Sequence, residues 1–261
     1  MNIKIHQRRH DLTTDRAKHE IEHGKFLSCG DAELTWGWGS PAGQFRARRR
    51  AVMLVDATGI KSGSMVLEVG CGTGMFTEML AATDANILAV DISPQLLEKA
   101  RNRTSWSNRV RFLEKSFEDC DIDGPFDAVL GSSILHHLEV EVSLRKIFNM
   151  LRPGGVVAFA EPNMLNPQIC IQKNIPWIKK IMGDSPDETA FVRWKLASLL
   201  TRIGYCNVSI IPFDWLHPVT PAILIQPVSI LSKLLENIPV IREFSGSLLI
   251  QASRPALVTS L

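Results

Sequence analysis

The sequence lacks the features that mark several large classes of protein. No run of 18 apolar residues occurs, so no segment is expected to span a bilayer. The 29 Lys and Arg residues nearly balance the 27 Asp and Glu residues, and a net charge of +2 gives no electrostatic reason to expect a nucleic-acid partner. The first ten residues hold no apolar core of signal-peptide length. We therefore expect a soluble, cytoplasmic protein.

Cysteine is also scarce. Five cysteines are scattered along the chain, without a C-x-x-C pair or a His/Cys cluster: Cys29, Cys71, Cys120, Cys170 and Cys206. An odd number without metal-ligand spacing favours free thiols in a reducing compartment over disulfides or structural zinc. The sequence therefore predicts no metal site.

The most informative stretch that is present is VLEVGCGTG at 66–74, an apolar strand that runs into a glycine-rich turn, followed by a helical pattern at 75–81. Glycines at alternate positions allow a tight turn and leave no Cβ between the main chain and a ligand. A strand, a glycine turn and a helix form the nucleotide-binding corner of a doubly wound α/β sheet. With 261 residues and 45% hydrophobic composition, the chain is long enough for one such domain with a large core.

The spacing of this turn decides which nucleotide it suits. Gly70, Gly72 and Gly74 do not fit the dinucleotide fingerprint G-x-G-x-x-G, because position 75 is Met. An NAD-linked oxidoreductase is therefore disfavoured. Glu68 lies two residues before the first glycine, and a carboxylate there suits a cationic amino group better than a pyrophosphate.

Further signals follow in order. A second apolar strand, 87–91, ends in Asp91, which lies 21 residues past Gly70, where an acid meets ribose hydroxyls. Ser93 and Pro94 then open a helix as N-cap and first helical residue. Three more strands are expected at 110–114, 126–130 and 156–161, the last after a turn at 151–155. Alternating strands and helices predict a parallel sheet with crossover helices.

This series resembles the class I S-adenosylmethionine-dependent methyltransferases (type 11-like) from about residue 44 to 161. The resemblance implies an α/β fold with a doubly wound, seven-stranded, mostly parallel sheet and helical insertions. The sixth and seventh strands would be 205–213 and 247–252, with the seventh antiparallel beside the fifth and sixth. The domain would span 44–261, after an N-terminal arm at 1–43. Its insertions would lie at about 162–190 and 215–244, and we expect the first to act as a substrate lid because the second should leave the sheet at another edge.

The same resemblance implies S-adenosyl-L-methionine as the cofactor. Glu68 and the glycine turn would hold its amino-acid portion, Asp91 its ribose, and Ile92, Ser116 and Phe117 its adenine. Ser116 stands where the family usually has an aspartate. The predicted cofactor residues are Glu68, Gly70, Cys71, Gly72, Gly74, Asp91, Ile92, Ser116, Phe117 and Ser132.

Two histidines follow the fourth strand, where the transferable methyl group should emerge. His136 or His137 is the candidate general base, because imidazole titrates near neutral pH. Alternatively, one histidine caps the next helix and the other packs beside the cofactor. Glu161, at the end of the fifth strand, is the other candidate base, and His217 is a weaker third.

Two further groups of residues, four arginines and two tryptophans, each have two possible interpretations. Arg46, Arg48, Arg49 and Arg50 lie near the start of a predicted helix, 44–56, and form a solvated face or, through Arg46 or Arg50, meet the methionine carboxylate or an anionic substrate. Trp36 and Trp38 lie in a Gly-rich loop, and either anchor the N-terminal arm or close over a ligand.

The favoured function is methyl transfer to a small-molecule acceptor, possibly with an apolar portion, at oxygen, carbon or nitrogen. The alternative is a catalytically silent S-adenosylmethionine-binding or scaffold protein. Peripheral membrane contact through 223–225 and the following helix is a lesser alternative to a buried helix. The oligomeric state does not follow from the sequence.

Overall fold

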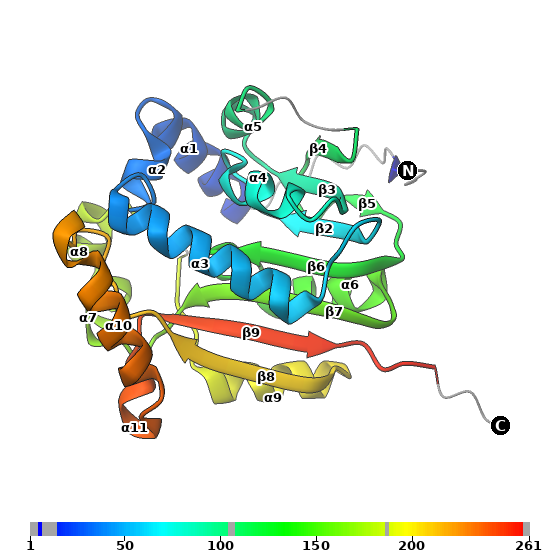
Figure 1. Cartoon of the computed structure of the whole chain (residues 1–261). Helices are drawn as coiled ribbons and strands as arrows, with labels where there is room; N and C mark the ends of the chain where they lie inside the picture. Colours follow the sequence, from blue (N-terminus) through cyan, green and yellow to red (C-terminus); the bar gives the residue numbers. More distant parts are fainter. Residues whose placement is uncertain (1–4, 7–14, 104–107, 186–187, 258–261) are drawn as a thin grey trace.

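The computed structural model describes residues 5–6, 15–103, 108–185 and 188–257 (Figure 1). Seven strands form one sheet in the order β4-β3-β2-β6-β7-β9-β8, in which β9 runs antiparallel to both of its neighbours. The strands are β2 (Met65–Val69), β3 (Asn86–Asp91), β4 (Val110–Glu114), β6 (Phe126–Ser132), β7 (Leu151–Pro162), β8 (Cys206–Phe213) and β9 (Ser247–Ser253). Two short strands, β1 (Ile5–His6) and β5 (Asp121–Ile122), pair with each other. The predicted seven-stranded α/β sheet with its antiparallel seventh strand is confirmed.

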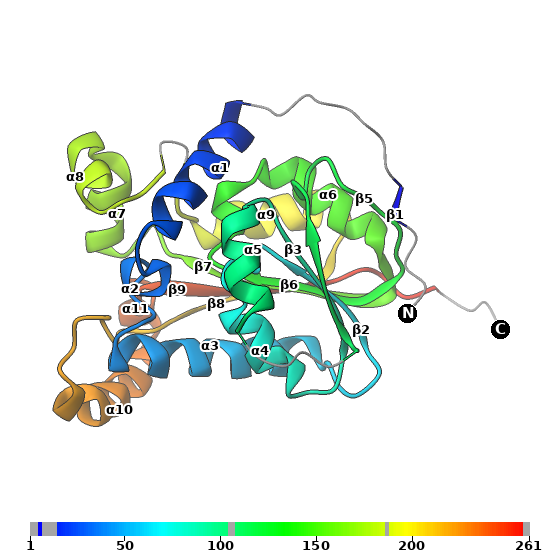
Figure 2. The ribbon, with the colours of Figure 1, turned by 90° about the horizontal axis from the view of Figure 1, so that it is seen from above.

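Helices cover both faces of the sheet (Figure 2). Helices α3, α4 and α5 pack on one face, and α6 and α9 pack on the other. The helices are α1 (Asp15–Ser28), α2 (Ala32–Thr35), α3 (Pro41–Thr58), α4 (Met75–Ala81), α5 (Pro94–Arg101), α6 (Val140–Met150), α7 (Pro167–Asn174), α8 (Pro176–Ile181), α9 (Arg193–Ile203), α10 (Ile225–Glu236) and α11 (Pro239–Arg242), with 3₁₀ turns η1 (Leu135–His137) and η2 (Ala222–Leu224). Among the described residues, none of these helices has the length and hydropathy needed to cross a membrane.

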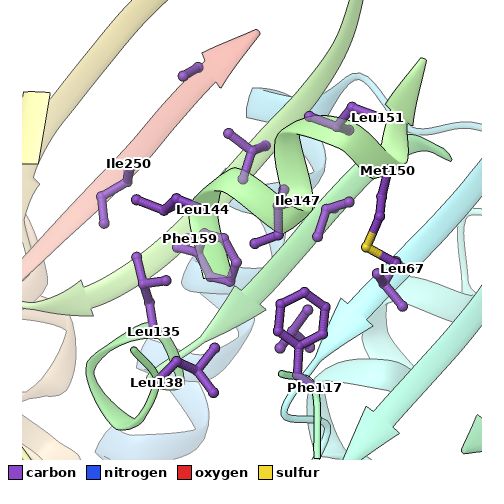
Figure 3. Packing of buried hydrophobic residues seen from close by; sticks show 14 of the residues in the cluster. Leu67, Phe117, Leu135, Leu138, Leu144, Ile147, Met150, Leu151, Phe159 and Ile250 are labelled. Atoms are coloured by element: carbon purple, nitrogen blue, oxygen red, sulfur yellow. The ribbon is translucent and has the colours of Figure 1, made fainter. Parts of the chain in front are cut away.

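The core forms because the central strands are apolar on both faces. Leu67 of β2 belongs to the same cluster as Leu144 and Ile147 of α6 (Figure 3), whereas Val66 belongs to the cluster on the opposite face that contains Leu80 of α4. Strands buried on both faces read as near-continuous hydrophobic runs, as β2 and β3 do here. Each fully buried leucine of this kind stabilises the fold by about 1.5–3 kcal/mol.

Local signals set several helix boundaries. Ser93 caps α5 by accepting a hydrogen bond from the Leu96 amide, and Pro94 occupies the first turn, as predicted. Pro176 separates α7 from α8, because a proline inside a helix removes a backbone hydrogen bond. Helix α3 begins at Pro41 behind the Ser40 cap, three residues before its predicted start.

The predicted turn at 151–155 lies inside β7 instead of preceding it. Phe126 pairs with Leu151, and Ala128 pairs with Val156, so four residues of β7 lie opposite one residue of β6. Gly154 adopts φ 77° in this irregular segment. A bulge interrupts the ladder without ending the strand, which explains why turn residues here do not mark a strand boundary.

The prediction that the second insertion leaves the sheet at another edge than the first is wrong. Strand β9 is antiparallel to both β7 and β8, so β8 runs parallel to β7. The carboxyl end of β8 therefore lies at the same edge of the sheet as the carboxyl end of β7. Both insertions begin at this edge.

The described part of the N-terminal arm packs against α5. A Cβ on Gly24 of α1 would lie 2.6 Å from the Ser93 Oγ at the start of α5, so glycine permits this close approach. Residues 1–4 and 7–14 of the predicted arm lie outside the described residues. The boundary at 43 falls within α3, and the division into arm and domain remains a prediction.

Candidate active site

A cavity of about 760 Å³ lies at the carboxyl edge of the sheet. Its size is in the range of small-molecule binding sites. One half of its wall comes from the loops that follow β2, β3 and β4 and from Ser132 at the end of β6. The other half comes from α1, η1, α7, Asp184, Glu188 and the segment 214–219. In doubly wound sheets, ligands bind at this edge.

The glycine turn lines the first half through Gly70, Cys71 and Gly72. Gly70, Gly72 and Gly74 all have left-handed backbones, with φ of 69°, 52° and 78°. A Cβ on Gly70 would lie 2.2 Å from the Ile134 side chain, and one on Gly72 would lie 3.2 Å from the Trp36 ring. The turn is thus a cradle that only glycine forms easily, which fits a ligand held against the main chain. Gly74 is the N-cap residue of α4 and does not line the cavity.

Asp91 lies beside this turn and faces the cavity. Its Oδ2 accepts a hydrogen bond from the Gly72 amide at 2.7 Å, and its Oδ1 accepts one from the Ser93 amide at 2.9 Å. Burial raises the pKa of Asp91, and the two amide donors oppose that shift. Each oxygen keeps a further lone pair, so the carboxylate is held in place and still able to accept from ribose hydroxyls.

Four other predicted cofactor residues reach the same cavity: Ile92, Ser116, Phe117 and Ser132. The structure brings them together with the glycine turn, although they lie at the ends of three different strands, β3, β4 and β6. Their contacts with the cofactor stay predictions.

Glu68 is not brought into the cavity. Side chains alternate along a strand, and Glu68 shares the face of β2 that carries Val66. Burial raises the pKa of Glu68 to about 7, and the charge of Asp91 adds to that effect. Its Oε2 has no hydrogen-bond partner among the described residues. Glu68 is therefore buried outside the cavity lining, and its predicted direct contact with the amino group is not supported by its placement.

Arg50 is the buried cation of the cavity, with 3% of its surface exposed. Its guanidinium donates to the Ser133 Oγ at 3.0 Å and to the Ser247 Oγ at 2.5 Å, and it lies 4.9 Å from the centre of the Trp38 ring. Burial and the neighbouring Arg46 charge lower the pKa of Arg50 to about 10. Among the described residues it makes no ion pair with a carboxylate. A buried charge of this kind favours an anionic ligand.

The interpretation of these arginines as a solvated face is wrong for most of them. Arg46 pairs with the buried Asp214 at 2.8 Å, and Arg49 pairs with Glu236 at 2.5 Å. Arg48 is exposed. The arginines face inward because the second insertion supplies their acidic partners, which sequence distance conceals.

The two interpretations of the tryptophans, as an anchor or as a cover over a ligand, each fit one of them. Trp38 is buried and packs edge-to-face on Phe76 at 5.7 Å, so it anchors the segment before α3. Trp36 lies over Gly72 with about a third of its surface exposed and lines the cavity.

Glu161 is fully buried and does not line the cavity. Its Oε1 accepts from the Ile134 and Leu135 amides, and its Oε2 lies 2.6 Å from His136 Nδ1. Burial alone would raise the pKa of Glu161, but the His136 contact and the two amide donors outweigh it and lower the pKa. Glu161 is therefore an ionised positioning residue, and its placement does not support the predicted role as a base.

His136 and His137 both line the cavity, with ring centres 4.2 Å apart. Burial lowers the pKa of His136, so its neutral ring donates from Nδ1 to Glu161. His137 Nδ1 lies 3.0 Å from Glu20, and its Nε2 lies 3.3 Å from Glu188. Burial disfavours the charge on His137, but these two carboxylates outweigh it and raise the pKa.

Several site residues lie in segments that carry no recognisable motif. Glu188 is held by Lys173 of α7, which also pairs with Asp184 at 2.9 Å. Burial opposes ionisation of Glu188, yet His137 and Lys173 lower its pKa to about 2. Arg16 of α1 donates to the carbonyl oxygens of His136 and His137. No sequence signal identifies these residues, because each joins the site only through the folding of a distant segment.

Parts of this chain are similar to known methyltransferases. A family model described as a methyltransferase domain matches residues 66–155. The nodulation protein S of Bradyrhizobium diazoefficiens is 29% identical over 126 residues, which cover 47% of this chain and 60% of that protein. A ubiquinone biosynthesis O-methyltransferase of Xanthomonas campestris pv. campestris is 33% identical over 150 residues, covering 56% of this chain and 62% of that protein. The chain thus matches less than two thirds of the length of these relatives.

The fold has solved counterparts. The crystal structure of the N-methyltransferase NodS from Bradyrhizobium japonicum WM9, in complex with S-adenosyl-L-homocysteine, superposes with a TM-score of 0.60 at 17% identity. The match covers 91% of this chain and 99% of that one. The similarity therefore concerns the fold and extends over most of this chain.

Proposed function

The chain carries a class I S-adenosylmethionine-dependent methyltransferase domain, and we propose that it transfers the methyl group of S-adenosylmethionine to a small-molecule acceptor. The observation that carries this proposal is that most of the residues predicted to bind the donor share one cavity with the histidine cluster. Gly72 and Asp91 line one half of it, and His137 and Glu188 line the other. A donor and an acceptor bound in the two halves would be neighbours.

The cofactor half is suited to each part of the ligand. The glycine cradle gives the methionine portion close access to main-chain groups. Asp91 is fixed by two amides and would accept from the ribose hydroxyls. Arg50 is a buried cation in the same cavity, and we assign it to the methionine carboxylate, the sharper of the two sequence-based interpretations.

Methyl transfer requires mainly that the protein holds the donor and the acceptor in position. When bound, S-adenosylmethionine supplies a methyl group already activated on a sulfonium. The protein has to hold the acceptor atom in line with that methyl group and exclude water, which supplies several orders of magnitude in rate. Both insertions border the cavity, and apolar side chains such as Leu216 and Ile169 join its wall. These support an acceptor with an apolar portion.

The polar end of the acceptor half is the cluster around His137. Because Glu20 and Glu188 flank the His137 ring, the isolated site favours its protonated form, which is not a base. We assign His137, with His136 beside it, to holding the polar group of the acceptor next to the methyl donor. One of the two relatives by sequence is an O-methyltransferase, and the structural relative is an N-methyltransferase. These names support an oxygen or nitrogen acceptor.

The experiment is a search for the methylated product. The protein is incubated with a small-molecule cell extract and isotope-labelled S-adenosylmethionine, and labelled products are identified by mass spectrometry. We expect a labelled small molecule with the wild type and none with Asp91→Ala. Binding of S-adenosylhomocysteine without any labelled product from extracts of several sources would instead favour the catalytically silent alternative.

A further inference from the structure

The acceptor half contains a group of side chains that serves no purpose in binding S-adenosylmethionine. One ring nitrogen each of His136 and His137 and one carboxylate oxygen of Glu188 lie within 4.8 Å of one another. His136 and Glu188 are buried, and His137 is half-buried. We propose that His136, His137 and Glu188 form a binding site for a divalent transition-metal ion in the acceptor half of the cavity.

The donor set has the chemistry of such a site. Two imidazoles and one carboxylate suit zinc, manganese, iron or cobalt better than magnesium or calcium, which prefer oxygen ligands alone. Bonds of about 2.1 Å to a central ion would bring the ligand atoms to within roughly 3–4 Å of one another. The His137 Nε2 and Glu188 Oε1 atoms are already 3.3 Å apart. The cluster therefore needs to close by only about 1 Å around an ion.

Outer contacts hold two of the three side chains in the orientation that metal ligands require. His136 Nδ1 donates to the buried Glu161, which leaves Nε2 as the nitrogen for a metal. Lys173 binds the Oε2 of Glu188, which leaves Oε1 facing His137. Metal-binding histidines almost always donate their other ring N–H to a carboxylate, a carbonyl or water, and binding carboxylates are hydrogen-bonded in turn.

The surroundings also favour a cation. Glu20 lies 3.0 Å from the His137 Nδ1, and that nitrogen has no hydrogen bond of good geometry among the described residues. Glu20 is thus placed to orient His137 from behind or to join as a fourth ligand. All four side chains line the cavity, so an ion has a path of entry and would lie beside a bound acceptor.

The test measures metal binding directly and does not depend on methyl transfer. Full-length protein without a histidine tag is freed of metal with a chelator. It is titrated with Zn²⁺ by calorimetry and with Co²⁺ by visible absorption. We expect one ion per chain and d–d bands from Co²⁺ bound to nitrogen and oxygen ligands. His136→Gln, His137→Gln and Glu188→Gln should each weaken binding by about tenfold or more.

The matched control is His217→Gln. His217 also lines the cavity but lies outside the cluster, where it contacts Gln168 at 3.0 Å. Its replacement should leave metal affinity unchanged, and S-adenosylhomocysteine binding reports that each variant is folded. The proposal is overturned if the wild type binds no stoichiometric ion, or if the His217 variant loses as much affinity as the cluster variants. Either outcome leaves the proposed methyl transfer untouched.

Discussion

The two halves of the cavity are built in different ways. In the cofactor half, the glycine turn and Asp91 come from consecutive strand ends, and main-chain amides fix them. In the acceptor half, Glu20, His137 and Glu188 come from three distant segments, and side-chain ion pairs join them. A site fixed by local backbone geometry tolerates variation elsewhere in the chain. A site made by long-range side-chain pairs is free to diverge, which suits a fold that keeps one donor and changes its acceptor.

The largest expected effect is on the glycine cradle. Gly72→Val places a β-branched residue at φ 52°, with its Cβ 3.2 Å from the Trp36 ring, and fills the space where the ligand meets the main chain. We expect affinity for S-adenosylhomocysteine, measured by calorimetry, to fall by about 100-fold or more. The control is Gly59→Val, at φ 63° with open space around it. Both variants should lose about 1–3 kcal/mol of stability to backbone strain. Equal affinities in the two variants would show that the turn does not face the ligand.

The next effect concerns Asp91, the carboxylate that is predicted to bind the ribose of the cofactor. Asp91→Ala removes an ionised acceptor of two hydroxyl hydrogen bonds, worth about 1.5–3 kcal/mol each before compensation. We expect a net loss of about 2–4 kcal/mol in the binding of S-adenosylhomocysteine, or roughly 30- to 1000-fold. Asp84→Ala, at the other end of the β3 strand, serves as the control for removing an acid from this part of the chain. Unchanged affinity in Asp91→Ala would remove this residue from the site.

Replacing Glu68 should stabilise the protein, whereas the preceding variants weaken ligand binding. The reason is that this carboxyl group is buried and does not line the cavity. Its folded-state pKa is raised from an ordinary 4.5 to about 7, so the folded protein holds a proton that the unfolded chain has released. The stability of the wild type should therefore fall as pH rises from about 4.5 to 7, by up to about 3 kcal/mol. Glu68→Gln removes this dependence, so its gain in stability over the wild type should grow from pH 5 to pH 8. Urea unfolding at both pH values measures the difference, with Glu98→Gln, an exposed site, as the control. A Glu68 variant less stable than the wild type at pH 8 would contradict the assignment.

The smallest effect separates the two ends of the cofactor. Arg50→Lys keeps the charge but loses the fork of donors, so we expect S-adenosylhomocysteine to bind about tenfold more weakly, a change of about 1.4 kcal/mol. Binding of 5′-methylthioadenosine, which has no carboxylate, should stay the same. Arg48→Lys, an exposed change on the same helix, should affect neither ligand. Parallel losses for both ligands in Arg50→Lys would show that Arg50 acts through the fold and not through the carboxylate.

The sequence predicted the cofactor half because its signals are local. The strand before Gly70, the acid at Asp91 and the Ser93 cap each act within a few residues, so short patterns report them. Glu68 shows the limit of this approach, since the motif names the residue, but the alternation of β2 decides which way it points. The antiparallel seventh strand beside the fifth and sixth followed from the family resemblance.

The acceptor half could not be predicted from the sequence, because its residues come from segments that are far apart along the chain. The partners of His137, Glu20 and Glu188, lie 117 and 51 residues away along the chain, and no periodicity links them. The same holds for Arg46 and Asp214, whose pairing turns a predicted solvated face into a buried one. The absence of metal-ligand spacing carried little information here, because the possible ligands beyond the adjacent histidines meet only through tertiary folding.

The most direct test of the account is a crystal structure of the protein with S-adenosylhomocysteine. The account predicts the ribose on Asp91, the adenine beside Ile92 and Phe117, and the sulfur directed across the cavity toward His137. This arrangement would place the donor of the cofactor half against the acceptor half. A complex whose sulfur points away from His137, or whose ligand lies outside the glycine cradle, would contradict the division of the cavity into donor and acceptor halves.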